Sequence, residues 1–372
     1  MITIRQVKSK KELKAFVKFP FTLFKDNPYW VPPIIKDELD NFDPGINPVF
    51  DQADAFFFLA YKNEQIAGRV VAIVNHIEIE KQGIKKIRFG WFDVIDDIKV
   101  SEALLNKVVE IGKEQQLDFI EGPIGFTNLD KVGVLTQGFD EIGTMISWYS
   151  LPHYKEHLEQ LGFEKEKEFI ESYFSFTNVT PEYFQKAQAA IKKRYGLKAM
   201  TFKKTSEIMP HVDKMFNLFN ESYARLASYV PIDEKLREYF KKKYIGFINP
   251  EYIIFVADEK DEIIAFSIVM PGFARALQKA KGKLLPFGIY HLLKAKKHSK
   301  EVLFYLIGIK PEYQNKGVTA IIFDEYYKVF RSKGIETFIR SAELEENHAI
   351  HQLWKHFNPV IHKRRRTYRK DI

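Results

Sequence analysis

The sequence contains no cysteine, which excludes disulfide scaffolds, thiolate metal sites and cysteine nucleophiles. Its first residues lack the apolar core of a secretory signal, and no later run is apolar over the length needed to cross a bilayer. No spacing of His, Asp or Glu indicates a metal centre. We therefore expect a cytoplasmic protein without a metal, either soluble or held peripherally at the inner face of the membrane.

Acidic residues are absent from 263 to 300, although the chain as a whole has a net charge of only +8. The segment Phe273–His298 alternates apolar residues with basic ones, a pattern typical of a surface that lies on an anionic membrane. A basic flap packed on its own domain fits the pattern equally well. Nucleic acid is a weaker alternative, because the aromatic residues do not form a stacking platform. The basic residues of this span are Arg275, Lys279, Lys281, Lys283, Lys294, Lys296, Lys297 and Lys300.

The length of 372 residues favours two domains, and the predicted elements occur twice in the same order. In both halves a strand and a helix precede a β-hairpin, which is followed by a third strand, a second helix and a further strand. Residues 117–122 (LDFIEG) and 335–340 (IETFIR) occupy matching places after matching helices. We predict an α+β protein built by internal duplication, with one domain at 1–176 and the other at 177–372.

The most informative stretch runs from Glu301 to Phe330. An apolar run, Val302–Ile309, predicts a buried strand; Pro311 ends it, and a polar turn with Gly317 leads into a helix with apolar residues at helical spacing. Backbone N–H groups at a helix start lack intrahelical partners and lie at the positive end of the helix dipole. Gly317 would allow close approach of a phosphate, and Lys316 would add positive charge. The stretch therefore predicts an anion site.

The corresponding turn of the first half has no glycine. Between strand FDVID and helix SEALLNK it carries Asp96, Asp97 and Lys99, and the two carboxylates would repel a pyrophosphate. We expect only the second half to bind such a ligand.

The glycine turn resembles the acyl-CoA-binding motif of the Gcn5-related N-acetyltransferase (GNAT) superfamily, Gln/Arg-x-x-Gly-x-Gly/Ala after a central strand. Gln314, Gly317 and Thr319 occupy the key places, with Thr319 departing from the small residue expected and Ala320 directly after it. The resemblance implies two tandem GNAT-like domains, each a mixed, mostly antiparallel sheet flanked by helices. It also implies a site for acetyl-CoA or long-chain acyl-CoA in the second domain. The residues of this expected site are Ile307, Gly308, Ile309, Gln314, Asn315, Lys316, Gly317, Val318, Thr319 and Asn347.

Other segments are similar to a family of bacterial tandem acyltransferase-fold proteins that includes bacterial ceramide synthases. They are NPYWVPP, the hairpin region from NPVFDQ to AIVN, FGWFDVIDD and the loop EGPIGFTNLDKVGVLTQGFDEIG. The resemblance spans nearly the whole chain. It implies transfer of an acyl group from a CoA thioester to a primary amine, with a lipid amine such as a sphingoid base as one candidate.

The expected catalytic residues are less well defined. Many members of the superfamily use a carboxylate base and a tyrosine acid on the last helix, but Trp354 stands at the tyrosine's place here. Our candidates are Glu345, Glu346 and Tyr305, with Glu345 first as base or amine anchor. Acidic residues in a first helical turn also stabilise a helix without any chemistry.

Two other functions stay open. A non-catalytic domain pair that binds acyl-CoA or a protein partner would explain the missing tyrosine. Aminoacyl transfer from charged tRNA to a peptide also uses paired acyltransferase folds, but the second half has no inserted pair of long charged helices. The sequence does not indicate the oligomeric state.

Overall fold

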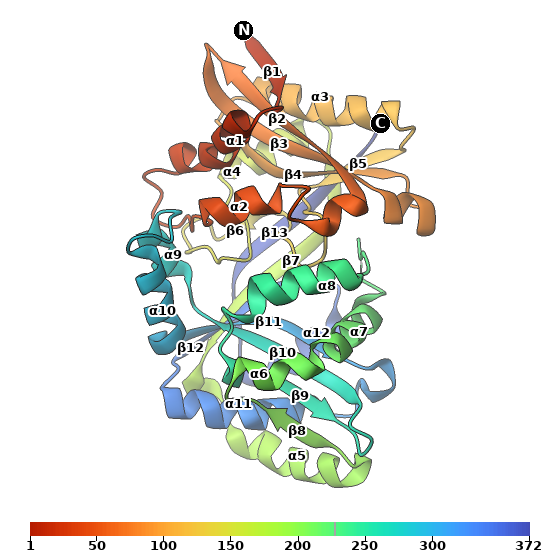
Figure 1. Cartoon of the computed structure of the whole chain (residues 1–372), viewed down its shortest axis with the longest axis vertical. Coiled ribbons are helices and arrows are strands. Elements are labelled where there is room, and N and C mark those ends of the chain that lie inside the picture. The colour runs from red at the N-terminus through yellow and green to blue at the C-terminus, as the bar shows by residue number, and fades with distance from the viewer. Residues whose placement is uncertain (227) are drawn as a thin grey trace.

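The computed structural model describes residues 1–226 and 228–372 (Figure 1). Within the described residues the strands form one thirteen-stranded sheet with the order β1-β2-β3-β4-β5-β13-β7-β12-β11-β10-β9-β8, while β6 pairs with β13 off this path. The strands are β1 (Ile2–Gln6), β2 (Ala53–Lys62), β3 (Gln65–Asn75), β4 (Lys86–Val94), β5 (Phe119–Gly122), β6 (Val134–Gln137), β7 (Glu164–Ser175), β8 (Lys198–Thr201), β9 (Ile253–Ala257), β10 (Ile263–Pro271), β11 (Glu301–Ile309), β12 (Thr337–Leu344) and β13 (Val360–Asp371).

Helices pack on the sheet in both halves. In the first half α3 contacts β3 and β4; in the second, α7 contacts β10 and β11, and α5 lies beside α11. The α-helices are α1 (Lys10–Leu23), α2 (Ile35–Asn41), α3 (Ile98–Glu114), α4 (Pro152–Gln160), α5 (Pro181–Tyr195), α6 (Thr205–Ile208), α7 (Val212–Tyr223), α8 (Glu234–Phe240), α9 (Ala274–Ala280), α10 (Gly288–His298), α11 (Thr319–Lys333) and α12 (His348–Trp354).

The two halves repeat one topology, which confirms the predicted fold class. In the first half, each of the strands β1 to β5 pairs with the next one, and all of these pairs are antiparallel except β4 with β5. In the second half, strands β8 to β12 pair in the same way. The parallel pairs are β4 with β5 and β11 with β12, at matching positions. Each half is thus a mixed, mostly antiparallel sheet.

The halves exchange their last strands. The final strand of the chain, β13, pairs with β5 of the first half, and β7, which ends the first half, pairs with β12 of the second. The exchanged strands also pair with each other from Val360↔Tyr173 to Arg369↔Glu164 and join the two sheets into one. The N- and C-termini consequently both lie in the upper part of Figure 1. A division at 176 stays a prediction; in the structure, each half completes its sheet with a strand from the other side of that point.

A buried ionic cluster holds the two exchanged strands together. Glu171 of β7 bonds Arg365 of β13, and Lys363 Nζ lies 3.3 Å from the same carboxylate; all three side chains are almost fully buried. Burial alone would raise the pKa of Glu171, but the charges of Arg365 and Lys363 lower it to about 2. The carboxylate is therefore ionised at every pH at which the protein is expected to work.

Apolar and polar contacts also cross between the halves elsewhere. One buried apolar cluster contains Val71, Trp91 and Phe126 of the first half together with Phe219 and Phe255 of the second. Near it, the buried Arg88 guanidinium bonds Glu78 and donates to the carbonyl of Ser228 at 3.0 Å. The two repeats therefore share a core.

Candidate active site

Strands β11 and β12 separate part-way along their length. Their parallel pairing ends at Phe304↔Arg340, although β11 continues to Ile309 and β12 to Leu344. We call this place the β11–β12 split. Lys310 N–H donates to the carbonyl of Ile264 on β10, and backbone groups of alternate residues point to opposite edges of a strand. The backbone groups of Ile307 and Ile309 accordingly point into the split.

The carbonyl groups of Ile307 and Ile309, which β12 does not reach, accept hydrogen bonds from side chains instead. The Tyr223 hydroxyl donates to Ile307 O at 3.1 Å, and Gln314 Nε2 donates to Ile309 O at 3.2 Å. Gly308 faces the other edge, and a Cβ there would lie 2.2 Å from Phe266, so this glycine is required by packing within the sheet. Of the predicted strand residues, only Ile307 and Ile309 offer backbone to a ligand in the split.

The predicted anion-binding turn directly follows the split. Asn315 and Gly317 adopt positive φ angles of 60° and 75°, and α11 begins at Thr319 without a side-chain cap. Within the described residues, no acceptor bonds the N–H groups of Gly317, Val318 and Thr319. Uncapped N–H groups at the positive end of a 15-residue helix are available to an anion.

Lys316, a residue of this turn, lies against two tyrosine rings. Its ammonium lies 5.2 Å from the Tyr313 ring centre and 5.3 Å from that of Tyr195, at the C-terminal end of α5. The charge is thereby held near the N–H groups of the turn.

The matching helix start in the first half is closed. Asp97 caps α3 by accepting from Lys99 N at 3.0 Å, and its carboxylate also pairs with Lys62 at 2.7 Å. The hydrogen bond from Lys62 lowers the pKa of Asp97. The strand separation beside it is filled as well, because Ile124 N–H donates to Phe89 O at 2.8 Å and a Cβ on Gly90 would lie 2.7 Å from Ile124 O. In the first half, the Asp97 carboxylate therefore occupies the helix start, and the backbone of Ile124 fills the gap between the strands.

A carboxylate that the sequence reasoning missed borders the split. Glu343 is largely buried on β12, three residues beyond the last residue paired with β11. It bonds the Arg340 guanidinium, and Trp354 Nε1 donates to it at 3.1 Å. Burial raises the pKa of Glu343, although the charge of Arg340 opposes this. A carboxyl group with a raised pKa is suited to accept a proton near neutral pH.

Trp354 occupies the position where the superfamily resemblance implies a tyrosine. Its ring is buried against Phe304, Phe323 and Phe174, and the Arg340 guanidinium lies 5.0 Å from the ring centre. Trp354 therefore positions Glu343 through its indole N–H.

Two tyrosines lie close to the same place. Burial raises the pKa of Tyr223, with the charge of Glu343 as a further contribution, and burial also raises the pKa of Tyr305. Both hydroxyls are therefore protonated at neutral pH. Tyr305, the first residue of β11 beyond the pairing with β12, donates to Leu129 O at 3.3 Å. That carbonyl belongs to the first-half loop around Asn128 and Asp130, so the loop reaches the second half beside the split.

The other predicted catalytic residues lie in exposed ion pairs. Glu345 pairs with Arg364 at 2.6 Å, which lowers its pKa, and Glu346 pairs with Lys167 at 2.7 Å. Asn347 caps α12 by accepting from Ile350 N at 3.3 Å. Their functional roles stay predictions; in this geometry each has a structural partner.

The missed residues left little signal in the sequence. The predicted strand ended at Arg340, which left Glu343 in a presumed connection, whereas β12 continues to Leu344. Tyr223 closes α7 as one aromatic among many on an amphipathic helix. Simple alternation past Arg340 would place Glu343 on the opposite face of the strand, but the pairing of β12 with β7 shifts register between Arg340 and Glu343, and the two side chains bond each other.

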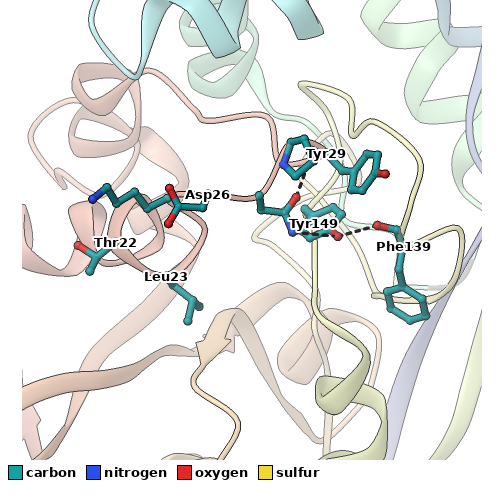
Figure 2. Close-up of a pocket in the computed structure, with 9 residues that line it drawn as sticks. Thr22, Leu23, Asp26, Tyr29, Phe139 and Tyr149 are labelled. Atoms are coloured by element: carbon teal, nitrogen blue, oxygen red, sulfur yellow. Dashed lines mark hydrogen bonds between the residues drawn. The ribbon is translucent and has the colours of Figure 1, made fainter.

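A surface hollow of about 380 Å³ lies elsewhere, in the first half (Figure 2). Asn27 Nδ2 donates to the Tyr149 hydroxyl, which in turn donates to Phe139 O at 2.7 Å. The hollow contains none of the residues of the split. Across the described parts of the chain, we find neither a cluster of three metal-ligating side chains nor a helix long and apolar enough for a bilayer.

Solved structures share this architecture over the whole chain. A tandem GNAT protein from the clavulanic acid biosynthesis pathway has a TM-score of 0.58 at 10% identity, with 100% of this chain and 98% of that chain covered. A GCN5-related N-acetyltransferase from Sphaerobacter thermophilus has a TM-score of 0.54 at 9% identity, covering 100% and 95%. The chain has a tandem GNAT fold.

Two curated proteins are similar to this tandem GNAT chain in sequence from end to end. Protein YghO of Escherichia coli strain K12 is 27% identical over 380 residues, covering 99% of this chain and 95% of that protein. The bacterial ceramide synthase of Caulobacter vibrioides strain NA1000 / CB15N is 23% identical over 381 residues, covering 100% and 98%. No protein-family model matches the chain.

Proposed function

We propose that the protein is an acyl-CoA-dependent N-acyltransferase that transfers an acyl group from a CoA thioester to a primary amine. The observation that carries the proposal is the uncapped turn 314–319 beside the β11–β12 split, with Glu343 at the edge of that split. The turn would hold the pyrophosphate through the N–H groups of Gly317, Val318 and Thr319. The backbone of Ile307 and Ile309 would hold the pantetheine arm.

The chemistry follows from the groups around the split. Glu343 accepts a proton from the ammonium form of the substrate, and the neutral amine nitrogen attacks the thioester carbonyl carbon. The C–N bond forms, the C–S bond breaks, and CoA leaves as a thiolate that takes up a proton. The nitrogen, which carries a surplus proton after the attack, releases that proton to solvent as the amide forms, and Glu343 returns its own proton to solvent. Tyr223 is our candidate donor, because its hydroxyl reaches the split and burial keeps it protonated. Tyr305 is the second candidate. The hydroxyl of each tyrosine donates to a backbone carbonyl, that of Tyr223 to Ile307 O and that of Tyr305 to Leu129 O, and would leave this carbonyl to protonate the thiolate.

The acceptor is a lipid amine and the acyl chain is long in this proposal. The similarity to a bacterial ceramide synthase supports that choice, as does the basic and apolar segment Phe273–His298. The enzyme would then work in the cytoplasm at the inner face of the membrane. One acyl-CoA would bind per chain, because Asp97 closes the matching helix start of the first half.

Release of free CoA thiol in the presence of a panel of amines tests the proposal. We expect thiol release that depends on a long-chain primary amine, and Glu343→Gln should lower kcat by about 100-fold or more, the range typical of a positioned general base. Glu336→Gln is the matched control, because it removes an exposed carboxylate directly before the start of β12 and should change kcat less than threefold. Acyl-CoA binding without amine-dependent thiol release would favour the non-catalytic alternative.

A further inference from the structure

The insertion between β10 and β11 carries an exposed apolar patch that the proposed chemistry does not use. Five large side chains within nine residues of sequence are exposed, and four of them are more than half exposed. The exposed fractions are 75% for Leu285, 71% for Phe287, 60% for Tyr290 and 59% for Leu293. Large apolar side chains exposed together in this way mark an interaction surface.

Other apolar side chains of the insertion are buried and pack it against the rest of the protein. Leu277 and Leu292 are buried against Val31 and Ile34 of the first half, and Leu284 packs partly against the same cluster. The outer patch is therefore not the face that folds the insertion onto the protein. The segment thus packs its apolar inner face on the first half, not on its own domain, and exposes apolar residues on the other face. Its expected contact with a membrane stays a prediction.

The backbone fixes the patch in its outward position. Ile289 N–H donates to Leu284 O at 2.7 Å, and a Cβ on Gly288 would lie 1.9 Å from Lys283 O, so only glycine permits this tight loop. Bonds to the body restrain the whole insertion: Gln278 Nε2 donates to Pro28 O at 2.8 Å, and Ile35 N–H donates to Gly282 O at 2.9 Å. α9 and α10 accordingly stand as one unit at the side of the molecule, between its upper and lower parts (Figure 1).

The positive charge of the insertion indicates which kind of surface the patch would bind. Lys294 and Lys297 follow Leu293 by one and four residues on α10 and are exposed, and Lys281 and Lys283 are exposed beside Leu285. No acidic residue occurs from 263 to 300. An apolar patch whose own segment supplies cations and no carboxylate fits a bilayer of anionic lipids, in which the apolar groups enter the acyl boundary while the cations meet headgroups.

We infer that this patch, formed by Leu285, Phe287, Tyr290 and Leu293 with Lys294 and Lys297, docks the protein on an anionic membrane. The inference deepens the proposed function by naming the surface from which a lipid amine would be drawn. The docking itself requires neither acyl-CoA nor catalysis.

Flotation of the full chain with vesicles tests the inference. The wild type should float with vesicles containing phosphatidylglycerol and stay at the bottom with vesicles of phosphatidylcholine alone. Lys294→Glu/Lys297→Glu should weaken partition at least about 25-fold, because each cation near an anionic surface contributes about fivefold. The matched control, Lys99→Glu/Lys113→Glu on α3, makes the same charge change at exposed sites away from the patch and should float as the wild type does.

A second pair of variants tests the apolar part. Leu285→Ser/Phe287→Ser should abolish flotation, whereas Ile46→Ser, which also removes an exposed apolar side chain, should not. Thiol release with a long-chain primary amine dispersed in detergent, without vesicles, should be retained in both variants, which separates a failure of docking from a failure of the proposed activity. Wild type that stays at the bottom with anionic vesicles would overturn the inference. A dimer in light scattering that Leu285→Ser/Phe287→Ser dissociates would overturn it too, in favour of a second copy as the occupant.

Discussion

Glu343 occupies an unusual place for a charged side chain, on a strand and largely out of solvent. The guanidinium of Arg340 and the indole N–H of Trp354 bond it, and His351 Nδ1 lies 3.8 Å from its carboxylate. Burial raises the pKa of Glu343 while these partners oppose the rise. An acid limb in kcat/KM should follow from this, with activity lost as the pH falls through the raised pKa, above the ordinary value for glutamate.

Trp354→Phe tests how the indole positions this carboxylate. The phenyl ring keeps most of the buried packing but cannot donate to Glu343, and losing a donor to the charged form raises a carboxyl pKa. The acid limb of kcat/KM should therefore move to higher pH, with acyl-CoA affinity changed less than threefold. A pH profile that coincides with that of the wild type would contradict this role.

Residues of this kind are hard to predict from sequence. The strand, the glycine turn and the helix around Gly317 follow from an apolar run, a proline and helical periodicity, and the structure has all three. Sequence reasoning selected Glu345 and Glu346 at the start of the last helix, with Glu345 first because its place resembles an acidic position of the tandem acyltransferase family. It passed over Glu343, whose importance arises from burial and from two partners that only the fold brings together.

At the scale of elements, the exchanged strands β7 and β13 depend on a buried ionic cluster. Glu171 has a folded pKa of about 2 against an ordinary value of 4.5, so its ionised form stabilises the fold fully above pH 4.5. The contribution is lost as the pH falls from 4.5 through about 2. The difference corresponds to about 3 kcal/mol.

Glu171→Gln should lower the free energy of unfolding by about 3 kcal/mol or more at pH 7, because it leaves Arg365 and Lys363 buried without their counter-charge. The loss should shrink as the pH approaches 2. Urea unfolding at several pH values measures both effects. Glu164→Gln on the same strand is the control, since this exposed side chain should change stability by less than about 0.5 kcal/mol. A loss that is equal at pH 7 and pH 3 would contradict the account.

At the scale of the whole molecule, two repeats share one sheet and one core. The repeated order of elements was readable because each strand and helix has its own apolar period. The strand exchange could not be predicted, because the pairing of β13 with β7 joins residues almost 200 positions apart in the sequence. The residues of β13 by themselves indicate only an ordinary final strand. The interlocked sheet holds the split, the turn 314–319 and the insertion in a fixed relation.

Duplication with divergence also explains why one repeat alone would bind acyl-CoA. The helix start of α11 is uncapped and follows a glycine with positive φ, whereas that of α3 is occupied by the Asp97 carboxylate. A pyrophosphate would gain N–H donors at the first site and meet a negative charge at the second.

Isothermal titration of the full chain with a long-chain acyl-CoA tests this central claim most directly. We predict one acyl-CoA per chain for the wild type and at least a 100-fold loss of affinity for Gly317→Glu, which places a carboxylate at the turn. Gly83→Glu is the matched control, because Gly83 has a similar φ of 69° and no atom within 4 Å of an added Cβ; it should bind as the wild type does. Two acyl-CoA molecules per chain, or undiminished binding by Gly317→Glu, would contradict the account.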